Sequence, residues 1–170
     1  MNNPGLMKES LKIVGAVALL LLGAQGACAA DDKARLAELD AFWSETSRTV
    51  REGDFQGYSA TFHEAATLVS GTSRTSYPIA KALARWKQGF MDAKSGRIKA
   101  RVEFRFSQRI GDGSTAHETG IFLYSTVDAD GKPTRAHIHF EALLVKRGGW
   151  KMMMEYQKSK ATGEEWEKLK

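Results

Sequence analysis

The sequence has one cysteine, three prolines in 170 residues, and no apolar run of clear transmembrane length. A single cysteine excludes an internal disulfide framework and a metal site built on several thiolates. The longest apolar run, residues 13–22, is shorter than the roughly 20 residues that a membrane-spanning helix needs. The sequence also lacks a phosphate-binding glycine loop, a nucleotide fingerprint and a serine–histidine–aspartate arrangement, and we predict no cofactor.

Residues 1–30 have the three parts of a bacterial secretory signal. Lys8 and Lys12 form a basic start, residues 13–22 are the apolar centre, and residues 27–29 (ACA) offer small side chains to signal peptidase. We therefore predict a mature N-terminus at Ala30 or Asp31, and a periplasmic or secreted protein with no membrane attachment once the signal is removed. Lipidation at Cys28 is the alternative.

Removal of this signal leaves about 140 residues, the size of a single domain with its own core. We assign residues 31–160 to that domain and residues 161–170 to a charged, frayed tail. The formal charge is +5, and the basic residues are scattered rather than clustered. With no nucleic-acid-binding motif in addition, we predict no nucleic-acid partner.

Hydrophobic periodicity predicts helices first and strands afterwards. A period of three to four indicates helices over residues 31–52, 54–62 and 78–96, with a short strand at 66–70 after the second helix. From Ile98 the period changes to two, which indicates strands over residues 98–107, 116–127, 134–146 and 150–158. The fold class is therefore α+β, with three N-terminal helices packed on a curved antiparallel sheet.

The stretch at residues 134–146 is predicted to be the central strand, because neither of its two alternating faces is plainly solvated. Tight turns at Asp112-Gly113 and at Gly148-Gly149 give a provisional register for the two hairpins. On this register Phe104 lies opposite Ile121, and Glu141 lies opposite Tyr156. We expect this face to receive the helices. The reverse face, which carries Phe122, Tyr124, Phe140 and Met153, is expected to form a two-fold dimer.

Three segments carry a resemblance to a known family: residues 50–55 (VREGDF), 58–67 (YSATFHEAAT) and 144–151 (LVKRGGWK). With the order of helices and strands, they resemble the nuclear-transport-factor-2-like superfamily, which includes SnoaL-like proteins and ketosteroid isomerases. The resemblance covers nearly the whole mature chain. It implies a cone-shaped α+β fold with a pocket between helices and sheet, and frequently a homodimer through the outer sheet face. It does not assign an activity, because the family hosts enzymes and binders alike.

The catalytic residues of ketosteroid isomerases do not carry over to this chain. Thr46 stands where that enzyme has its tyrosine donor, Ser70 stands where the aspartate base is expected, and only Glu141 falls near the place of the acidic donor. Such an isomerase needs both a base and a donor to the enolate oxygen. We therefore do not predict that activity, and whether the protein is an enzyme stays open.

The candidate catalytic residues are Glu141, His139 and Tyr156. A carboxylate among apolar neighbours has a raised pKa and can act as an acid or a base. The alternative is a structural carboxylate held by the hydroxyl of Tyr156. His137, His139 and Glu141 also alternate as metal-ligand types, but three ligands spread along one strand strain a site, and we predict no metal. The predicted pocket residues are Trp43, Tyr58, Trp86, Phe104, Phe106, His117, Thr119, Ile121, Leu143 and Met154.

The sequence thus favours an exported protein that binds a small, mostly apolar molecule in the pocket, with no catalysis established. A first alternative is an enzyme of the same fold that performs proton transfer, hydration or hydrolysis with Glu141 and His139 or His117. A second alternative is a non-catalytic accessory or dimerisation domain.

Overall fold

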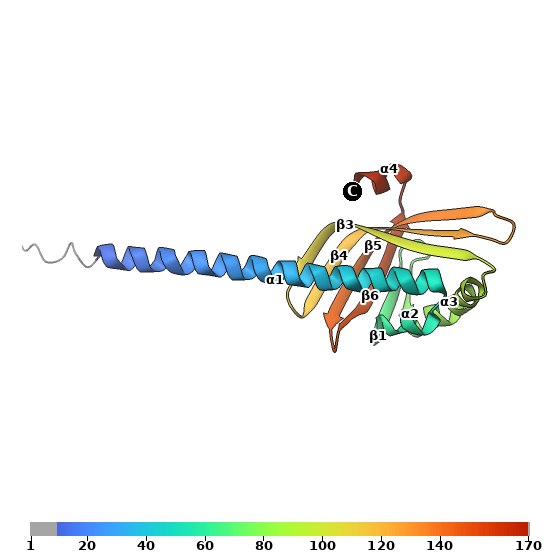
Figure 1. The fold of residues 1–170 in the computed structure, drawn as a ribbon, viewed down its shortest axis with the longest axis horizontal. Coiled ribbons are helices and arrows are strands. Elements are labelled where there is room, and N and C mark those ends of the chain that lie inside the picture. The colour runs from blue at the N-terminus through green and yellow to red at the C-terminus, as the bar shows by residue number, and fades with distance from the viewer. Residues whose placement is uncertain (1–9, 170) are drawn as a thin grey trace, which may run out of the picture.

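The computed structural model describes residues 10–169, with side chains from residue 31 onward. These residues form an α+β fold in which four helices accompany a six-stranded sheet (Figure 1). The helices are α1 (Ser10–Glu52), α2 (Phe55–Ala60), α3 (Ile79–Lys94) and α4 (Gly163–Lys168). The strands are β1 (Phe62–Ser70), β2 (Thr75–Pro78), β3 (Lys99–Gly111), β4 (Thr115–Val127), β5 (Pro133–Lys146) and β6 (Trp150–Lys160). Within the described part of the chain, no helix combines the length and apolar character needed to cross a membrane.

The sheet has the strand order β2-β1-β6-β5-β4-β3. Strand β5 lies between β4 and β6, so the prediction of a central strand is confirmed. The predicted all-antiparallel sheet is wrong in one place, because β1 pairs with β6 in the parallel direction. Strand β1 pairs with β2 on one side and with the last strand, β6, on the other, and α2 and α3 lie at this end of the sheet.

Helix α1 ends at Glu52, as predicted, but it does not begin at Asp31. It is continuous from Ser10 and projects beyond the sheet before it crosses the strands (Figure 1). The sequence around Asp31 explains the continuity, because residues 24–37 contain six alanines and no proline. Alanine is the strongest helix former, so nothing there ends the helix.

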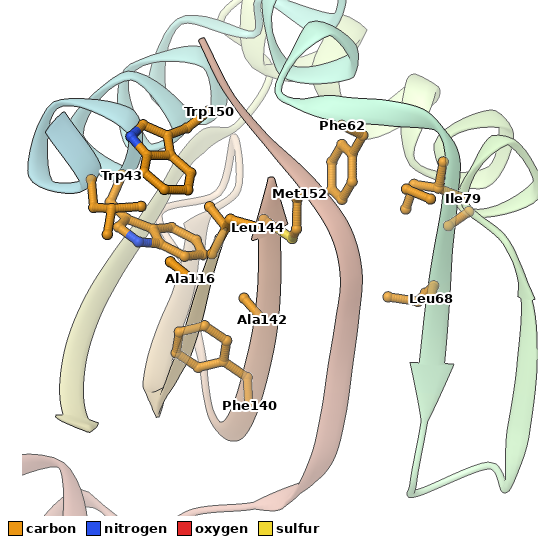
Figure 2. Close-up of a cluster of buried hydrophobic side chains, with 13 residues drawn as sticks. Trp43, Phe62, Leu68, Ile79, Ala116, Phe140, Ala142, Leu144, Trp150 and Met152 are labelled. Carbon is orange, nitrogen blue, oxygen red and sulfur yellow. The ribbon is translucent and has the colours of Figure 1, made fainter. Parts of the chain in front are cut away.

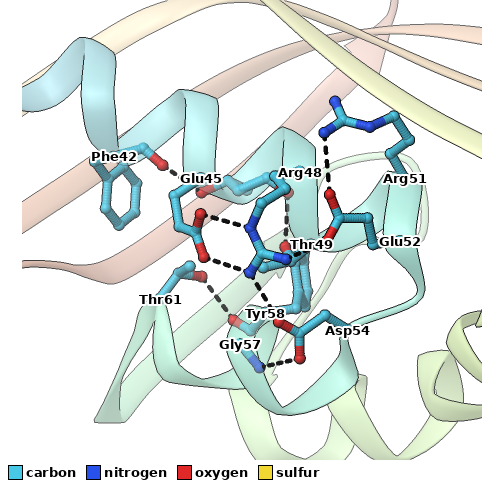
Figure 3. Close-up of polar contacts among 11 residues, drawn as sticks. Phe42, Glu45, Arg48, Thr49, Arg51, Glu52, Asp54, Gly57, Tyr58 and Thr61 are labelled. Atoms are coloured by element: carbon cyan, nitrogen blue, oxygen red, sulfur yellow. Dashed lines mark hydrogen bonds and ion pairs between the residues drawn. The ribbon is translucent and has the colours of Figure 1, made fainter.

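A sharp corner joins α1 to α2 and holds both helices against α3. Arg48 bridges Glu45, Glu52 and Asp54, and Asp54 caps α2 by accepting a hydrogen bond from the backbone N–H of Gly57 at 2.8 Å (Figure 3). Gly53 has a φ of +65°, and a Cβ there would lie 2.4 Å from the backbone nitrogen of Lys94. Glycine is therefore required at this corner by both conformation and close approach.

The core lies between α1 and the sheet (Figure 2). The ring of Trp43 packs on Phe104 with centroids 4.4 Å apart, and on Phe140 with centroids 5.7 Å apart. Phe140, Ala142 and Leu144 alternate along β5 and are at most 1% exposed. One face of the central strand is therefore the floor of the core.

The predicted frayed tail is wrong. Residues 163–168 form α4, whose start is fixed by a capping box between Thr162 and Glu165. Trp166 is 4% exposed, and the guanidinium of Arg105 lies 4.1 Å from its ring centroid. Because Arg105 and His139 contact α4 while α1 covers the opposite face, α4 packs on the side of the sheet away from the core.

Register shifts in two strand pairs decide which side chains face the helices. In the β3–β4 pair, Phe104 lies opposite Phe122 and not opposite Ile121, and Ser107 has no partner on β4. In the β5–β6 pair, Glu141 lies opposite Tyr156, as predicted, and Met153 and Lys158 have no partner on β5. A slip of one residue turns every side chain of a strand to the other face. The predicted assignment of faces is therefore inverted for β4, β5 and much of β6.

Candidate functional site

A cavity of about 460 Å³ lies between the helices and the inner face of the sheet. Eight of its wall residues are aromatic, and most of the others are aliphatic. The aromatic wall residues are Trp43, Tyr58, Trp86, Phe90, Phe104, Phe122, Tyr124 and Phe140. The remaining wall residues are Thr46, Val50, Arg85, Gly89, Ala100, Val102, Ala136, Ile138, Met152, Glu155 and Gln157.

The wall is built by strand alternation on one side and by helical repeats on the other. Ala136, Ile138 and Phe140 are alternate residues of β5, so they all face the cavity. On α3, Arg85, Trp86, Gly89 and Phe90 are spaced as one face of a helix. Arg85, Tyr124 and Ala136 are exposed to solvent, which places the mouth of the cavity beside them.

Glu155 is the acidic group of the cavity wall and is 8% exposed. The bulge at Met153 changes the alternation of β6, and as a result Met152, Glu155 and Gln157 face the same side. The amide of Gln157 donates a hydrogen bond of 2.7 Å to Oε1 of Glu155. Burial raises the pKa of the Glu155 carboxyl above its ordinary value, and the Gln157 hydrogen bond offsets part of that rise.

Tyr58 lies close enough to Glu155 for the two groups to interact electrostatically. Burial raises the pKa of the Tyr58 phenol well above its usual value, and negative charge on Glu155 raises this pKa further. The ring of Tyr58 also packs against Phe90 at 4.8 Å and Trp86 at 6.1 Å between centroids. The acid thus lies near Tyr58, whose ring belongs to an aromatic cluster of the cavity wall.

A second buried acid, Glu118, fixes the Trp43 side of the cavity. It is fully buried, accepts a hydrogen bond from Nε1 of Trp43, and pairs with Nε of Arg109 at 2.5 Å. Arg109 also pairs with Asp40 on α1. This network holds the indole of Trp43 in place, and Glu118 itself does not line the cavity.

The structure brings four of the ten predicted pocket residues into the cavity wall: Trp43, Tyr58, Trp86 and Phe104. Phe106 packs on the rings of Trp43 and Phe140 in the core beside it. The other five lie on the outer face, because each is adjacent in sequence to a residue of the inner face: His117, Thr119, Ile121, Leu143 and Met154. The structure contradicts their predicted placement. The cause is the unpaired residue Ser107, which shifts the register between β3 and β4 by one residue.

The three candidate catalytic residues are also on the outer face, outside the cavity. Glu141 accepts hydrogen bonds from Lys158 at 2.5 Å and from His117 at 3.3 Å. The Lys158 ammonium lowers the pKa of Glu141, which contradicts the predicted rise. His139 contacts Glu165 of α4 at 3.3 Å, and Tyr156 is the cross-strand neighbour of Glu141.

The outer face has a smaller hollow of about 320 Å³ beneath α4, lined in part by Thr119, Ile121, His139 and Lys158. Among the residues whose side chains are described, no group of three or more potential metal ligands occurs. Thr46 lines the cavity and donates its hydroxyl to the carbonyl of Phe42 at 2.9 Å, while Ser70 bonds with Ser73 on the β1–β2 side. Neither supplies a base or a free donor at the cavity wall.

Fold and cavity together define an α+β protein with helices on one face of a mixed sheet and an aromatic cavity between the two layers. No protein-family model matches the chain, and no curated protein matches it. The chain does match several solved structures. A conserved protein from Planctomyces limnophilus is 12% identical, with a TM-score of 0.62 over 73% of this chain and 94% of the other.

ActVI-ORFA from Streptomyces coelicolor is 25% identical, with a TM-score of 0.57 over 72% of this chain and 95% of the other. A protein from Catenulispora acidiphila, solved in complex with S-DNPA, is 19% identical, with a TM-score of 0.56 over 72% of this chain and 91% of the other. The chain has the nuclear-transport-factor-2-like, SnoaL-like fold, as the sequence resemblance indicated, and its activity is not assigned by these similarities.

The sequence prediction missed Glu155 and Gln157, because it turned their neighbour Tyr156 toward the helices, and strict alternation then turns Glu155 and Gln157 to the reverse face. The signal that could have found them is the run of residues 152–154 (MMM) in β6. Three consecutive apolar residues break a period of two, and such a break is typical of a bulge.

Proposed function

We propose that this protein is an exported, single-domain binder of a small, mostly apolar molecule, which it holds in the cavity between the helices and the sheet. The observation that carries the proposal is the aromatic cavity of about 460 Å³. That volume lies within the range of about 300–1,000 Å³ that is typical of small-molecule sites. A cone-shaped pocket that opens beside Arg85, Tyr124 and Ala136 fits this role.

The composition of the wall supports an apolar body for the ligand. Aromatic and aliphatic side chains offer extensive contact area, while the polar groups of the wall are few and gathered mainly near Glu155 and Gln157. The Catenulispora acidiphila protein in complex with S-DNPA is consistent with small-molecule binding in this fold.

The enzymatic alternative with Glu141 and a histidine is weakened by their position. Glu141, His117 and His139 lie on the outer face, where Glu141 is paired with Lys158, so they are not beside the cavity. We therefore propose binding rather than catalysis as the role of the cavity.

Export rests on the composition of residues 1–30. Residues 1–9 lie outside the described part of the chain, and of residues 10–30 only the helical backbone is described. Mass spectrometry of the protein from the periplasm or medium should find an N-terminus at Ala30 or Asp31. An intact residue 1, or a lipid on Cys28, would contradict this form of export.

Gly89 offers a sharp test of cavity binding. It lines the cavity from the middle of α3, and a Cβ placed there has no neighbouring atom within 4 Å. Gly89→Phe should fill the cavity with a ring, and Gly89→Ala is the matched control that removes the same glycine with little added volume. Either substitution removes a glycine from the interior of α3, where glycine is about 1 kcal/mol less favourable than alanine.

The measurement is fluorescence titration with the neutral probe N-phenylnaphthylamine. Gly89→Ala should bind it as the parent does, while Gly89→Phe should lose at least about tenfold in affinity without a lower melting temperature. If Gly89→Phe binds the probe as tightly as Gly89→Ala, the probe does not occupy the cavity and the proposal is wrong.

A further inference from the structure

The carboxyl of Glu155 has no cationic partner among the residues whose side chains are described. Its one hydrogen bond is the donation from Gln157 to Oε1, and no lysine, arginine or histidine pairs with it. Oε2 is left without a protein partner, yet it is not among the sealed, unpartnered polar atoms of the interior. Since Glu155 is a wall residue, Oε2 is open to the cavity.

A buried carboxylate without a counter-ion is unfavourable. There are two ways to relieve it, because the carboxyl can hold a proton or a cation can enter beside it. Burial raises the pKa of Glu155, which favours the protonated carboxyl more than it would be favoured in an exposed glutamate. A bound cation would replace that proton and would restore the charge of the carboxylate.

The surroundings of Glu155 suit a cation with an apolar body. The ring of Tyr58, which interacts with Glu155, packs on Trp86 and Phe90, and all three rings line the cavity. The electron-rich faces of such rings attract an ammonium group. The one basic residue of the wall, Arg85, stands at the mouth. Its guanidinium donates to the hydroxyl of Tyr77 and lies 4.9 Å from the Tyr77 ring centroid, and Tyr77 is not a wall residue.

We propose that the ligand of the cavity is an apolar amine, whose protonated nitrogen pairs with Oε2 of Glu155 while its hydrocarbon body fills the aromatic part of the cavity. This inference rests on the proposed binding function and names its ligand class. Because an ammonium group pairs with the charged carboxylate, the affinity for such an amine is coupled to the ionisation of Glu155.

The test uses two probes of one shape, naphthylmethylamine and naphthylmethanol, which differ only in an ammonium group against a hydroxyl. Binding is followed at neutral pH by the quenching of tryptophan fluorescence. The parent protein should bind the amine at least about tenfold more tightly than the alcohol, because a hydrogen bond between charged partners is roughly twice as strong as a neutral one.

Glu155→Gln keeps the shape of the side chain and removes its charge. It should weaken amine binding by about tenfold and leave alcohol binding within about twofold. Glu103→Gln is the matched control, because it removes one negative charge from an exposed position on β3 and should change neither affinity. The affinity of the parent protein for the amine should also fall as the pH is lowered and Glu155 becomes protonated. This measurement needs no variant.

The possible results separate this inference from the proposed function. Equal affinity for the two probes, or an alcohol bound more tightly with an affinity that falls as pH rises, would overturn the amine assignment and leave cavity binding intact. The second of these results would assign Glu155 as a hydrogen-bond donor to a neutral ligand. If neither these probes nor N-phenylnaphthylamine binds the parent protein, both the inference and the proposed function are wrong.

Discussion

At the scale of single residues, Glu155 links the stability of the protein to pH. Its folded-state pKa is raised by burial from an ordinary value of 4.5. A carboxyl with a raised pKa contributes its full stability below the unfolded value, and this contribution is lost as the pH rises toward the folded value. Burial in the cavity wall thus disfavours the charged carboxylate of Glu155.

We therefore predict that Glu155→Gln is more stable than the parent at neutral pH and that the difference shrinks at pH 4 and below. Each unit of pKa difference corresponds to about 1.4 kcal/mol, so an effect on the order of 1 kcal/mol is expected. Urea unfolding at several pH values measures it. A parent protein that gains stability relative to the variant between pH 4 and pH 8 would show that Glu155 is stabilised as an anion.

Glu141 has the opposite relation to pH. The Lys158 ammonium lowers its pKa, so its contribution to stability is present above the ordinary value of 4.5 and is lost as the pH falls. Glu141 is partly exposed, and solvent screening keeps this contribution small. The raised pKa that the sequence predicted for Glu141 thus belongs to Glu155 instead.

At the scale of elements, α4 is a structural part of the domain. Trp166 is buried beneath it, and Arg105 bonds to the Trp166 carbonyl at 2.8 Å while lying over its ring. Removing the indole leaves a cavity that the surrounding sheet can fill only in part.

We predict that Trp166→Ala lowers the free energy of unfolding by about 3 kcal/mol, since large-to-small changes of buried tryptophan cost about 3–5 kcal/mol. It should also speed amide hydrogen exchange in residues 163–168. The exposed Lys168→Ala change is the control, and it should have little effect. A loss below about 0.5 kcal/mol for Trp166→Ala would mean that the tail is frayed, as the sequence suggested.

The helices and strands also show how much of the structure the sequence could predict. Helical and strand periods, together with the turns at Asp112-Gly113 and Gly148-Gly149, predict most elements and the position of β5, because these signals are local. The inner face depends on Ser107, an unpaired residue in β3, and on Gly120, where a Cβ would lie 2.1 Å from the carbonyl oxygen of Arg105. No local pattern reveals that close approach, and without it the candidate site falls on the wrong face.

Strand β2 and the helical tail were missed for a related reason. Residues 71–78 are polar and rich in turn formers, and they become a strand only because β1 offers an edge to pair with. The tail is charged in sequence, and α4 depends on tertiary contacts of Trp166. In both places tertiary structure overrides local composition.

At the scale of the whole molecule, the proposed dimer needs a revised interface. Phe122 and Phe140 were expected to form it, but they line the cavity. The outer face instead presents Leu143, which is 39% exposed, together with the partly buried Met154 and Val145. Helix α4 covers another part of this face.

If a homodimer forms through the outer face, Leu143→Glu should convert it to a monomer, because a charge would be buried in the interface. Light scattering after size-exclusion chromatography measures the mass, with Met91→Glu at an exposed position on α3, away from the outer face, as the control. Identical masses for the parent and Leu143→Glu would place any interface elsewhere, and a parent that is already monomeric would contradict the dimer itself.

Two methionines of β6 make the central claim directly measurable. Met152 lines the cavity, whereas Met154 lies on the outer face, only two residues further along the same strand. Their methyl groups can be followed by NMR after labelling of methionine with carbon-13, and N-phenylnaphthylamine can then be titrated into the protein. Cavity binding predicts a large chemical-shift change for the methyl of Met152 and little change for that of Met154. A shift confined to Met154 would place the ligand on the outer face and contradict the account.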